Sequence, residues 1–531
     1  MYKKILYILV SILIAAVSAG CSGNITDIFT GDGDQQYEES KTVNFAVSDI
    51  RTLNPVVSRD EDTYFISKLI YQSLFILDDN LAPDGELVSD YKVGSDGKTV
   101  TMTLVKNACF SDGEKVQADD VKFSIESYMA AGSKSIYYSK VKGISSVTTD
   151  GKYKVKVRFK NAGDGGVKNL TFPILPAHLY TTAEITQRDS SFRPVGSGSY
   201  KVASYKSGSK LVLSKNKYTN SSVPDNRLVF TVYSDGNVLN LAEGNLVSFT
   251  VNKNIERQTE VGSKSLKTSD FCSNQLETVI FNCRSEILGS SEMRKAIAYS
   301  IDTEEIISKA YYNSAVSTNT LFYPGYLGIE NTGDLYSQDT KKAEDILKEL
   351  GAKDTDKDGI LNTDDGGNIK ITIIVNSDQA RNSAAQIIEE SIESLDIDAQ
   401  VVTLSDSEYR KRLRNGKFDI AFSGISFSDC YDVRGILGGS SDYTGYKDRT
   451  LQKLAVKLNS CIEEEKMIEC AADINEKIKD NLNYYPVCYR TYAVIASNEL
   501  TGEISSMFND IYRGCEGWYS VYQLDASDEE K

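Results

Sequence analysis

Alternation between apolar and polar residues is clearest from residue 144 to residue 160, where it predicts a β-hairpin. One face is apolar, and the residues between are lysine or arginine. The apolar face carries Tyr153, Val155, Val157 and Phe159. An Asp-Gly pair at 150–151 supplies the turn, because such pairs adopt the backbone angles of tight hairpins. One face of the hairpin should therefore be buried and the other solvated.

A strand, a turn and a helix are predicted between Asp96 and Ser127. One face of the strand carries Val100, Met102 and Leu104. After an Asp-Gly turn at 112–113, Asp119 and Asp120 mark the first turn of the helix, since carboxylates stabilise the positive end of the helix dipole. The apolar stripe of this helix consists of Val121, Ile125 and Tyr128.

Helical and strand patterns alternate in the second half of the chain. The predicted helices are Thr340 to Leu350, Ala380 to Leu395 and Ser405 to Gly416, and the strands are 369–375, 400–404, 418–422 and, at the end, 485–497. Strands separated by helices of this length indicate a mostly parallel sheet covered on both faces. The 531-residue chain should thus form two or three packed units of the α/β class.

The N-terminus has the pattern of a signal peptide. Lys3 and Lys4 precede the apolar run 5–17, which is shorter than the roughly 20 residues of a membrane-spanning helix. Small residues stand directly before Cys21, as at a bacterial lipoprotein cleavage site where the cysteine becomes lipid-modified. A plain secretory signal with an incidental cysteine is the alternative. Residues 22–41 are polar and rich in glycine, which predicts a flexible stalk.

Composition favours binding over catalysis. A net charge of −16 argues against nucleic acid or an anionic membrane surface as partner. The only histidine, His178, lies in an apolar run and is expected to be structural. No nucleophile elbow or zinc-protease motif is present, and no cofactor is expected. The eight cysteines after Cys21 could be free thiols or form one or two disulfides.

One acidic loop has the spacing of a calcium site. Aspartates stand at loop positions 1, 3, 5 and 12, with Gly359 at position 6. They are Asp354, Asp356, Asp358 and Asp365. A glycine pair and a strand follow, instead of the helix that such a loop normally enters. A metal-free turn and a calcium site both remain open.

The segment from Asp96 to Ser127 strongly resembles the extracellular solute-binding proteins of peptide-type ABC transporters, family 5. A D-G-K-T turn, an alternating strand, an F-S-D-G turn and an A-x-D-V-x-F-S helix occur there in this order, as they do here. The T-L-N-P turn at 52–55 and the M-R-K-A-I run at 293–297 continue the resemblance. It implies a two-lobed fold of the periplasmic-binding-protein type II, with an additional small α+β domain.

The resemblance also implies an order of domains along the chain. Lobe 1 would be built from three separate segments, and the small domain would be inserted between the first two. The expected segments are the signal peptide 1–20, the stalk 21–41, lobe 1 at 42–75, the small domain 76–190, lobe 1 again at 191–280, lobe 2 at 281–488, and a return to lobe 1 with the C-terminal tail at 489–531.

Ligand contacts are expected in the segment from Gly424 to Asp432. In peptide-binding members the first acidic residue of this segment pairs with the α-ammonium of the ligand, and here that residue would be Asp429. The same wall would include Gly424, Ile425, Ser426, Phe427 and Tyr431, and the facing wall Arg59, Glu61 and Asp62. Ile425 and Val433 replace the tryptophan and the proline of the family pattern, so a solvated loop carboxylate is an equal alternative for Asp429.

The resemblance implies a monomeric substrate-binding lipoprotein on the extracellular face of the bacterial cell membrane. It would close two lobes around a small solute, with a short peptide as the leading class, and deliver it to permease subunits of an ABC importer. A peptide-signal receptor and an oligosaccharide-binding protein on the same fold are the alternatives. A secreted hydrolase would need a nucleophile and a base that the sequence lacks.

Overall fold

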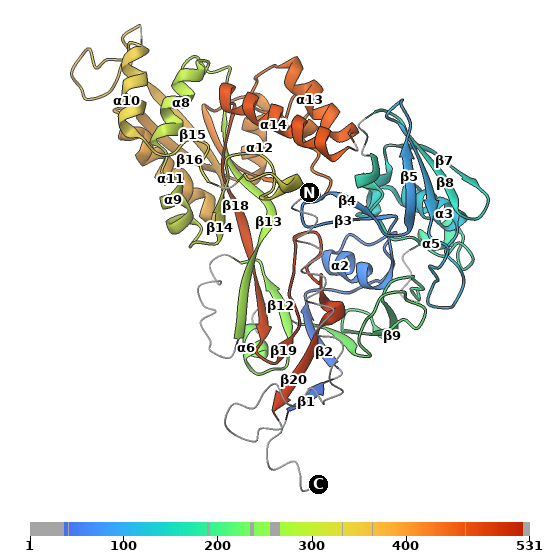
Figure 1. Ribbon diagram of the computed structural model, residues 1–531. Coiled ribbons are helices and arrows are strands. Elements are labelled where there is room, and N and C mark those ends of the chain that lie inside the picture. Colours follow the sequence, from blue (N-terminus) through green and yellow to red (C-terminus); the bar gives the residue numbers. More distant parts are fainter. Residues whose placement is uncertain are drawn as a thin grey trace, which may run out of the picture. The chain divides into compact units, whose positions relative to one another are not determined.

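The computed structural model describes residues 37–523 except 41, 163, 165, 188–191, 234–237, 255–265, 332, 364 and 462. Residues 40–520 form one compact unit, and the description below concerns that unit (Figure 1). Within the described ranges, no helix combines the length and the apolar character that crossing a bilayer requires. Cys21 lies outside the described residues.

The largest element is an 11-stranded mixed sheet. Its strands, in spatial order, are β16 (Asp398–Leu404), β15 (Lys370–Asn376), β17 (Ile420–Ser426), β13 (Leu266–Phe281), β18 (Tyr484–Ser497), β12 (Phe249–Asn252), β2 (Thr42–Val47), β11 (Arg227–Val232), β10 (Lys210–Lys215) and β9 (Tyr200–Lys206), with β14 (Ala315–Ser317) also paired to β18. The strands β16, β15 and β17 are parallel, as predicted, whereas β13 and β18 are antiparallel to their neighbours. The sheet is therefore parallel where helices connect β15, β16 and β17, and again where β2 pairs with β11 and β12, and it is antiparallel elsewhere.

The strands β13 and β18 run through both halves of this sheet. Leu266 to Cys272 pair with Ser497 to Thr491, and the pairing resumes at Leu276 opposite Tyr489 after a shift of register. The first part of β18 lies beside β14, and its last part pairs with β12. These two long strands therefore connect the part of the sheet that contains β17 to the part that contains β2.

A separate four-stranded antiparallel sheet lies between residues 88 and 159. Its strands are β5 (Val88–Val93), β6 (Thr99–Leu104), β8 (Lys154–Phe159) and β7 (Ile144–Asp150), and α3 (Ala118–Ala131) packs on it. The apolar faces predicted for the strand, the helix and the hairpin are buried, including Met102, Ile125 and Val157 at 0 % exposure. The predicted pattern of buried and solvated faces is thus confirmed here.

Helices cover both faces of the strands β15 and β17. One face packs against α8 (Ser291–Ser300), α10 (Thr340–Glu349) and α11 (Gln379–Glu393), and the other against α12 (Asp406–Asn415), α13 (Arg449–Ser460) and α14 (Glu464–Asn481). Ile373 and Ile374 show this alternation, because each is fully buried in a different one of the two apolar cores.

The predicted helix boundaries hold closely. Gly416, at a φ of 62°, ends α12 as expected, and Ser405 caps its start. For α10 the cap is Asp339 rather than Thr340, because the Asp339 carboxylate accepts the N–H of Lys342.

The remaining elements are short. They are α2 (Glu61–Ile70), α4 (Tyr138–Val141), α5 (Thr182–Ile185), α6 (Val238–Glu243), α9 (Thr303–Glu305), β1 (Tyr37–Ser40), β3 (Phe75–Leu77), β4 (Pro83–Gly85), β19 (Leu500–Thr501) and β20 (Tyr519–Gln523). Gly196 and Gly198 lie against the end of α2, where a β-carbon would come within 2.0 Å and 2.5 Å of the carbonyl oxygens of Ile70 and Leu69. Glycine at these positions is therefore a packing requirement.

Candidate functional site

Asp429 lies just beyond the end of β17 and forms a buried ion pair with Lys140. The Lys140 Nζ is 2.6 Å from the Asp429 Oδ2, and the two side chains are only 9 % and 8 % exposed. Lys140 belongs to α4, 289 residues away in sequence. The expected ammonium partner Asp429 thus already has an ammonium beside it, supplied by the chain itself.

Further donors complete the surroundings of this pair. The Tyr64 hydroxyl donates to the same Asp429 oxygen at 3.4 Å, and the Cys430 thiol donates to the other oxygen at 3.4 Å. The Lys140 ammonium also donates to the carbonyl of Thr171 at 3.4 Å and to its hydroxyl. Both charges are therefore hydrogen-bonded without any external group.

Both members of the pair stay ionised near neutral pH. Burial would raise the pKa of the Asp429 carboxyl, but the Lys140 ammonium brings this pKa below its ordinary value. Burial likewise would lower the pKa of Lys140, yet the Asp429 carboxylate brings it above its ordinary value. The pair is a salt bridge and not a neutral hydrogen bond.

A cavity of about 400 Å³ adjoins this ion pair. Its charged lining residues are Lys140, Lys142, Lys160, Lys168, Arg434, Asp164, Asp429 and Asp432. Arg434 is paired with Asp432 at 2.7 Å and with Asp164 at 3.5 Å. Lys168 is buried and donates to the Tyr326 hydroxyl at 2.8 Å, and burial lowers the pKa of its ammonium to about 8.

The predicted neighbours of Asp429 differ in accessibility. Tyr431 has no exposed surface; its hydroxyl donates to that of Tyr489 at 3.2 Å, and its ring stacks on that of the buried Phe427. Ser426 is exposed, and Ile425 is partly exposed. Of the expected wall, Tyr431 and Phe427 contribute packing, and Ile425 and Ser426 present surface.

Gly424 lies beneath a cluster of four charges that sequence reasoning missed. Arg381 contacts both carboxylate oxygens of Glu277, at 2.8 Å and 3.2 Å. Arg490 lies 2.5 Å from Glu277 and 3.1 Å from Asp378. Glu277 is fully buried. The available signals were Arg490, the one charged residue of β18, and Glu277 in the buried last part of β13, since a buried charge requires a partner.

The residues predicted for the facing wall lie at the start of α2 or just before it. Asp62 accepts the N–H groups of Ser48 and Asp49, at 2.7 Å and 3.0 Å, and so holds the end of β2. Glu61 pairs with Lys253 at 2.5 Å. Arg59 is exposed and has no carboxylate within 4 Å among the described residues. Among the described residues, Glu61 thus has a charged partner, Asp62 is bonded to backbone N–H groups, and Arg59 has no carboxylate beside it.

Only part of the acidic loop converges. Ligand atoms of Asp354, Asp356 and Asp358 lie within 4.8 Å of one another, and all three residues are exposed. Asp365 instead bonds the Thr363 hydroxyl and the Gly367 N–H. The His178 ring is 2.8 Å from Asp112, and this residue is exposed although it follows a buried apolar run. The eight cysteines of the described ranges form no disulfide.

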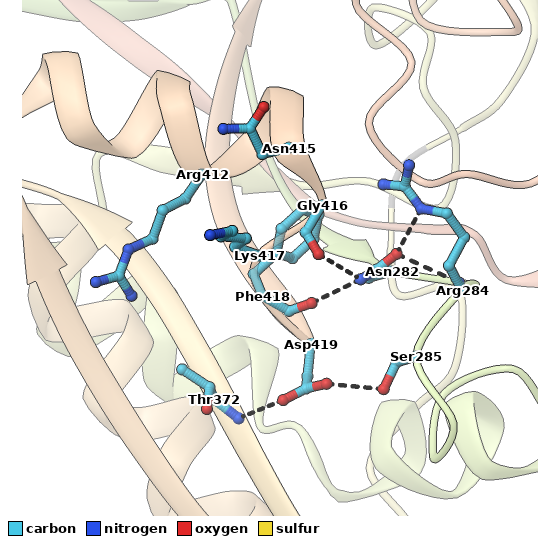
Figure 2. Close-up of a pocket in the computed structure, with 10 residues that line it drawn as sticks. All are labelled: Asn282, Arg284, Ser285, Thr372, Arg412, Asn415, Gly416, Lys417, Phe418 and Asp419. Atoms are coloured by element: carbon cyan, nitrogen blue, oxygen red, sulfur yellow. Dashed lines mark hydrogen bonds between the residues drawn. The ribbon is translucent and has the colours of Figure 1, made fainter.

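A second cavity, of about 530 Å³, lies at the start of β17, whereas Asp429 follows its end. Figure 2 shows the residues that line this cavity. Asn282 donates to the carbonyls of Gly416 and Phe418, and Asp419 accepts from the Ser285 hydroxyl and the Thr372 N–H. These bonds join the start of β17 to β15 and to the residues that follow β13. We assign this cavity no ligand, because its polar groups mostly hold the chain together.

Comparison with known families identifies the class of protein. Residues 82–443, more than half of the chain, match the family model described as bacterial extracellular solute-binding proteins, family 5, middle. The chain belongs to this family. The resemblance seen in the segment Asp96–Ser127 is thereby confirmed.

Two of the relatives that match this chain are named for the ligands that they bind. The chain is 25 % identical over 493 residues to the oligopeptide-binding protein AppA of Bacillus subtilis, covering 88 % of this chain and 89 % of AppA. It is 23 % identical over 320 residues to the glutathione-binding protein GsiB of Salmonella paratyphi A, covering 59 % of this chain and 62 % of GsiB.

Solved structures show the fold. A nickel ABC transporter protein of Bacillus halodurans superposes with a TM-score of 0.76 at 17 % identity, covering 89 % of this chain and 98 % of its own. AppA of B. subtilis in complex with a nonapeptide superposes with a TM-score of 0.60 at 21 % identity. The superposition covers 91 % of this chain and 100 % of the AppA chain. This family-5 protein therefore has the two-lobed α/β fold of periplasmic binding proteins.

Proposed function

We propose that this solute-binding protein captures short peptides outside the cell and delivers them to permease subunits of an ABC importer. The observation that carries the proposal is the similarity to an oligopeptide-binding protein over 88 % of the chain. The two halves of the large sheet are connected through β13 and β18, which suits hinge closure around a solute. Closure would be favoured because the ligand contacts both walls.

The proposed ligand site lies between the segment after β17 and the walls formed by α2 and α4. Gly424, Ile425, Ser426 and Asp429 would line one side of it. Arg59 and Glu61 would extend the facing side. The domain boundaries implied by the resemblance are part of this proposal, and the separate four-stranded sheet supports a small domain at 76–190.

The protein would act as a monomer that is held at the membrane by a lipid on Cys21. The polar segment 22–41 would give the folded part its distance from the bilayer. A Cys21→Ala variant should then appear in the culture medium or the soluble extracellular fraction, whereas the unaltered protein stays with the membrane. Equal membrane retention of both would contradict the lipid anchor.

Thermal unfolding with candidate ligands tests the peptide proposal. A ligand present at 100 times its Kd stabilises the folded state by about 2.7 kcal/mol, so binding is visible as a rise in Tm. Peptides of two to nine residues should raise the Tm, and oligosaccharides should not. The proposal is wrong if oligosaccharides raise the Tm and no peptide does. Calorimetric titration then gives the Kd of each peptide that responds.

A further inference from the structure

Both carboxylate oxygens of Asp429 already accept from groups of the chain itself. Its Oδ2 is held by Lys140 at 2.6 Å and by Tyr64 at 3.4 Å, and its Oδ1 by Cys430 at 3.4 Å. The lysine and the carboxylate are both nearly inaccessible to water. A peptide amino terminus could reach this carboxylate only by displacing Lys140, which would leave a buried lysine without its counter-charge.

The cavity beside the pair keeps an excess of positive charge after the internal pairs are formed. Its lining has five basic side chains and three acidic ones, and the acidic ones are engaged by Lys140 and Arg434. Among the described residues, no carboxylate lies within 4 Å of the ammonium groups of Lys142, Lys160 or Lys168. This local excess stands out in a protein whose net charge is −16. An anionic group is its electrostatic complement.

We propose that the Lys140 side chain occupies the place at Asp429 that the amino terminus of a bound peptide would take. In the same proposal, the adjoining cavity binds an anionic group of the ligand. The second half of the proposal rests on the proposed function, in that the anionic group would be a peptide carboxylate. The first half, the occupation of Asp429, holds for any ligand class.

A small ammonium ion tests the occupation of Asp429 without any peptide. Lys140→Ala removes the internal ammonium and leaves space beside a buried carboxylate. Ethylammonium chloride should raise the Tm of Lys140→Ala by several degrees above an equal concentration of sodium chloride, and should leave the unaltered protein unchanged. The double variant Lys140→Ala/Asp429→Asn should not respond. Lys134→Ala, which removes an exposed lysine near α4, is the matched control.

The Tm of the unaltered protein with ethylammonium chloride tests whether Asp429 is occupied even if Lys140→Ala folds poorly. An ethylammonium-specific rise in its Tm that Asp429→Asn abolishes would mean that Asp429 is free to bind amines, and would overturn the proposal. For a poorly folding Lys140→Ala, the yield of refolded protein with and without ethylammonium replaces the Tm. A yield that does not depend on ethylammonium would equally count against Lys140 as the occupant.

Blocked peptides test the anionic cavity. For a peptide that binds, N-acetylation should change the Kd less than threefold, whereas C-terminal amidation should weaken binding at least tenfold. The reverse pattern would overturn this half of the proposal. If no peptide binds at all, the proposed peptide function and its carboxylate both fail, while the ethylammonium experiment still decides whether Lys140 occupies Asp429.

Discussion

The guanidinium of Arg381 lies so close over Gly424 that a β-carbon on this glycine would come within 1.8 Å of its Nη2. The glycine therefore makes room for a side chain of the protein itself. Arg381 in turn holds Glu277, which also contacts Arg490. The identity of residue 424 is thus coupled to the charge cluster that lies beside the break in the β13–β18 pairing.

Gly424→Ala should displace Arg381 from Glu277. We expect the free energy of unfolding to fall by about 3 kcal/mol, since a steric clash and a disturbed buried ion pair act together. Urea denaturation monitored by circular dichroism measures the change. Gly435→Ala is the matched control, because a β-carbon there meets no atom within 4 Å. Equal stability of the two variants would contradict the role given to Arg381.

Glu277→Gln should be more damaging than the loss of an exposed carboxylate. Among the described residues, the variant leaves Asp378 as the one carboxylate paired with the mostly buried Arg381 and Arg490, at an expected cost of about 3–5 kcal/mol. Glu408→Gln removes a carboxylate from exposed ion pairs on α12 and should change stability by about 0.5 kcal/mol or less. Similar effects of the two substitutions in chemical denaturation would show that the cluster is dispensable.

Glu86 should make the protein less stable as the pH rises. Burial raises the pKa of this carboxyl from 4.5 to about 7, although the Ser73 N–H bonded to it acts in the opposite direction. The folded state then binds more protons than the unfolded state between these two values, so stability falls as the pH increases from about 4.5 to about 7.

Glu86→Gln should flatten that part of the pH profile. The free energy of unfolding of the variant minus that of the unaltered protein should therefore be larger at pH 8 than at pH 4. Urea denaturation at a series of pH values measures this difference. Glu114→Gln, which changes an exposed carboxylate, should leave the profile as it is. An unchanged slope in Glu86→Gln would refute the shifted pKa.

Tyr431 should support the fold and leave ligand affinity alone. Tyr431→Phe removes the hydroxyl that donates to Tyr489, at a cost of about 1 kcal/mol. Since the side chain has no exposed surface, the Kd for any peptide that binds should stay within a factor of two. Tyr312→Phe, at a 43 % exposed position, is the control for the loss of a hydroxyl. A large change in Kd with normal stability would return Tyr431 to the ligand site.

Local features of the fold could be predicted from the sequence because they depend on short spacings. The buried stripe around Ile125 and the end of α12 at Gly416 follow from helical period and from the left-handed conformation that glycine accepts. The antiparallel arrangement of β13 and β18 could not be predicted, since over 200 residues separate the two strands and no local pattern records which strands pair.

The ion pair at Asp429 could not be predicted from the sequence. The resemblance pointed to Asp429, whereas its partner Lys140 lies 289 residues away in a stretch with no unusual pattern. Tyr431 shows the same difficulty, because tyrosine is common both in protein cores and in binding sites. Its burial, which only the structure shows, identifies it as a core residue.

The two long strands also constrain how the chain can fold during synthesis. Before Tyr484 to Ser497 emerge, β13 lacks its neighbour on one side, and β12 lacks its pairing on the side away from β2. The central sheet is therefore completed only after β18 has been made, over 200 residues after β13. Contacts so distant in sequence predict slow acquisition of native structure, with an open chain persisting until β18 has emerged.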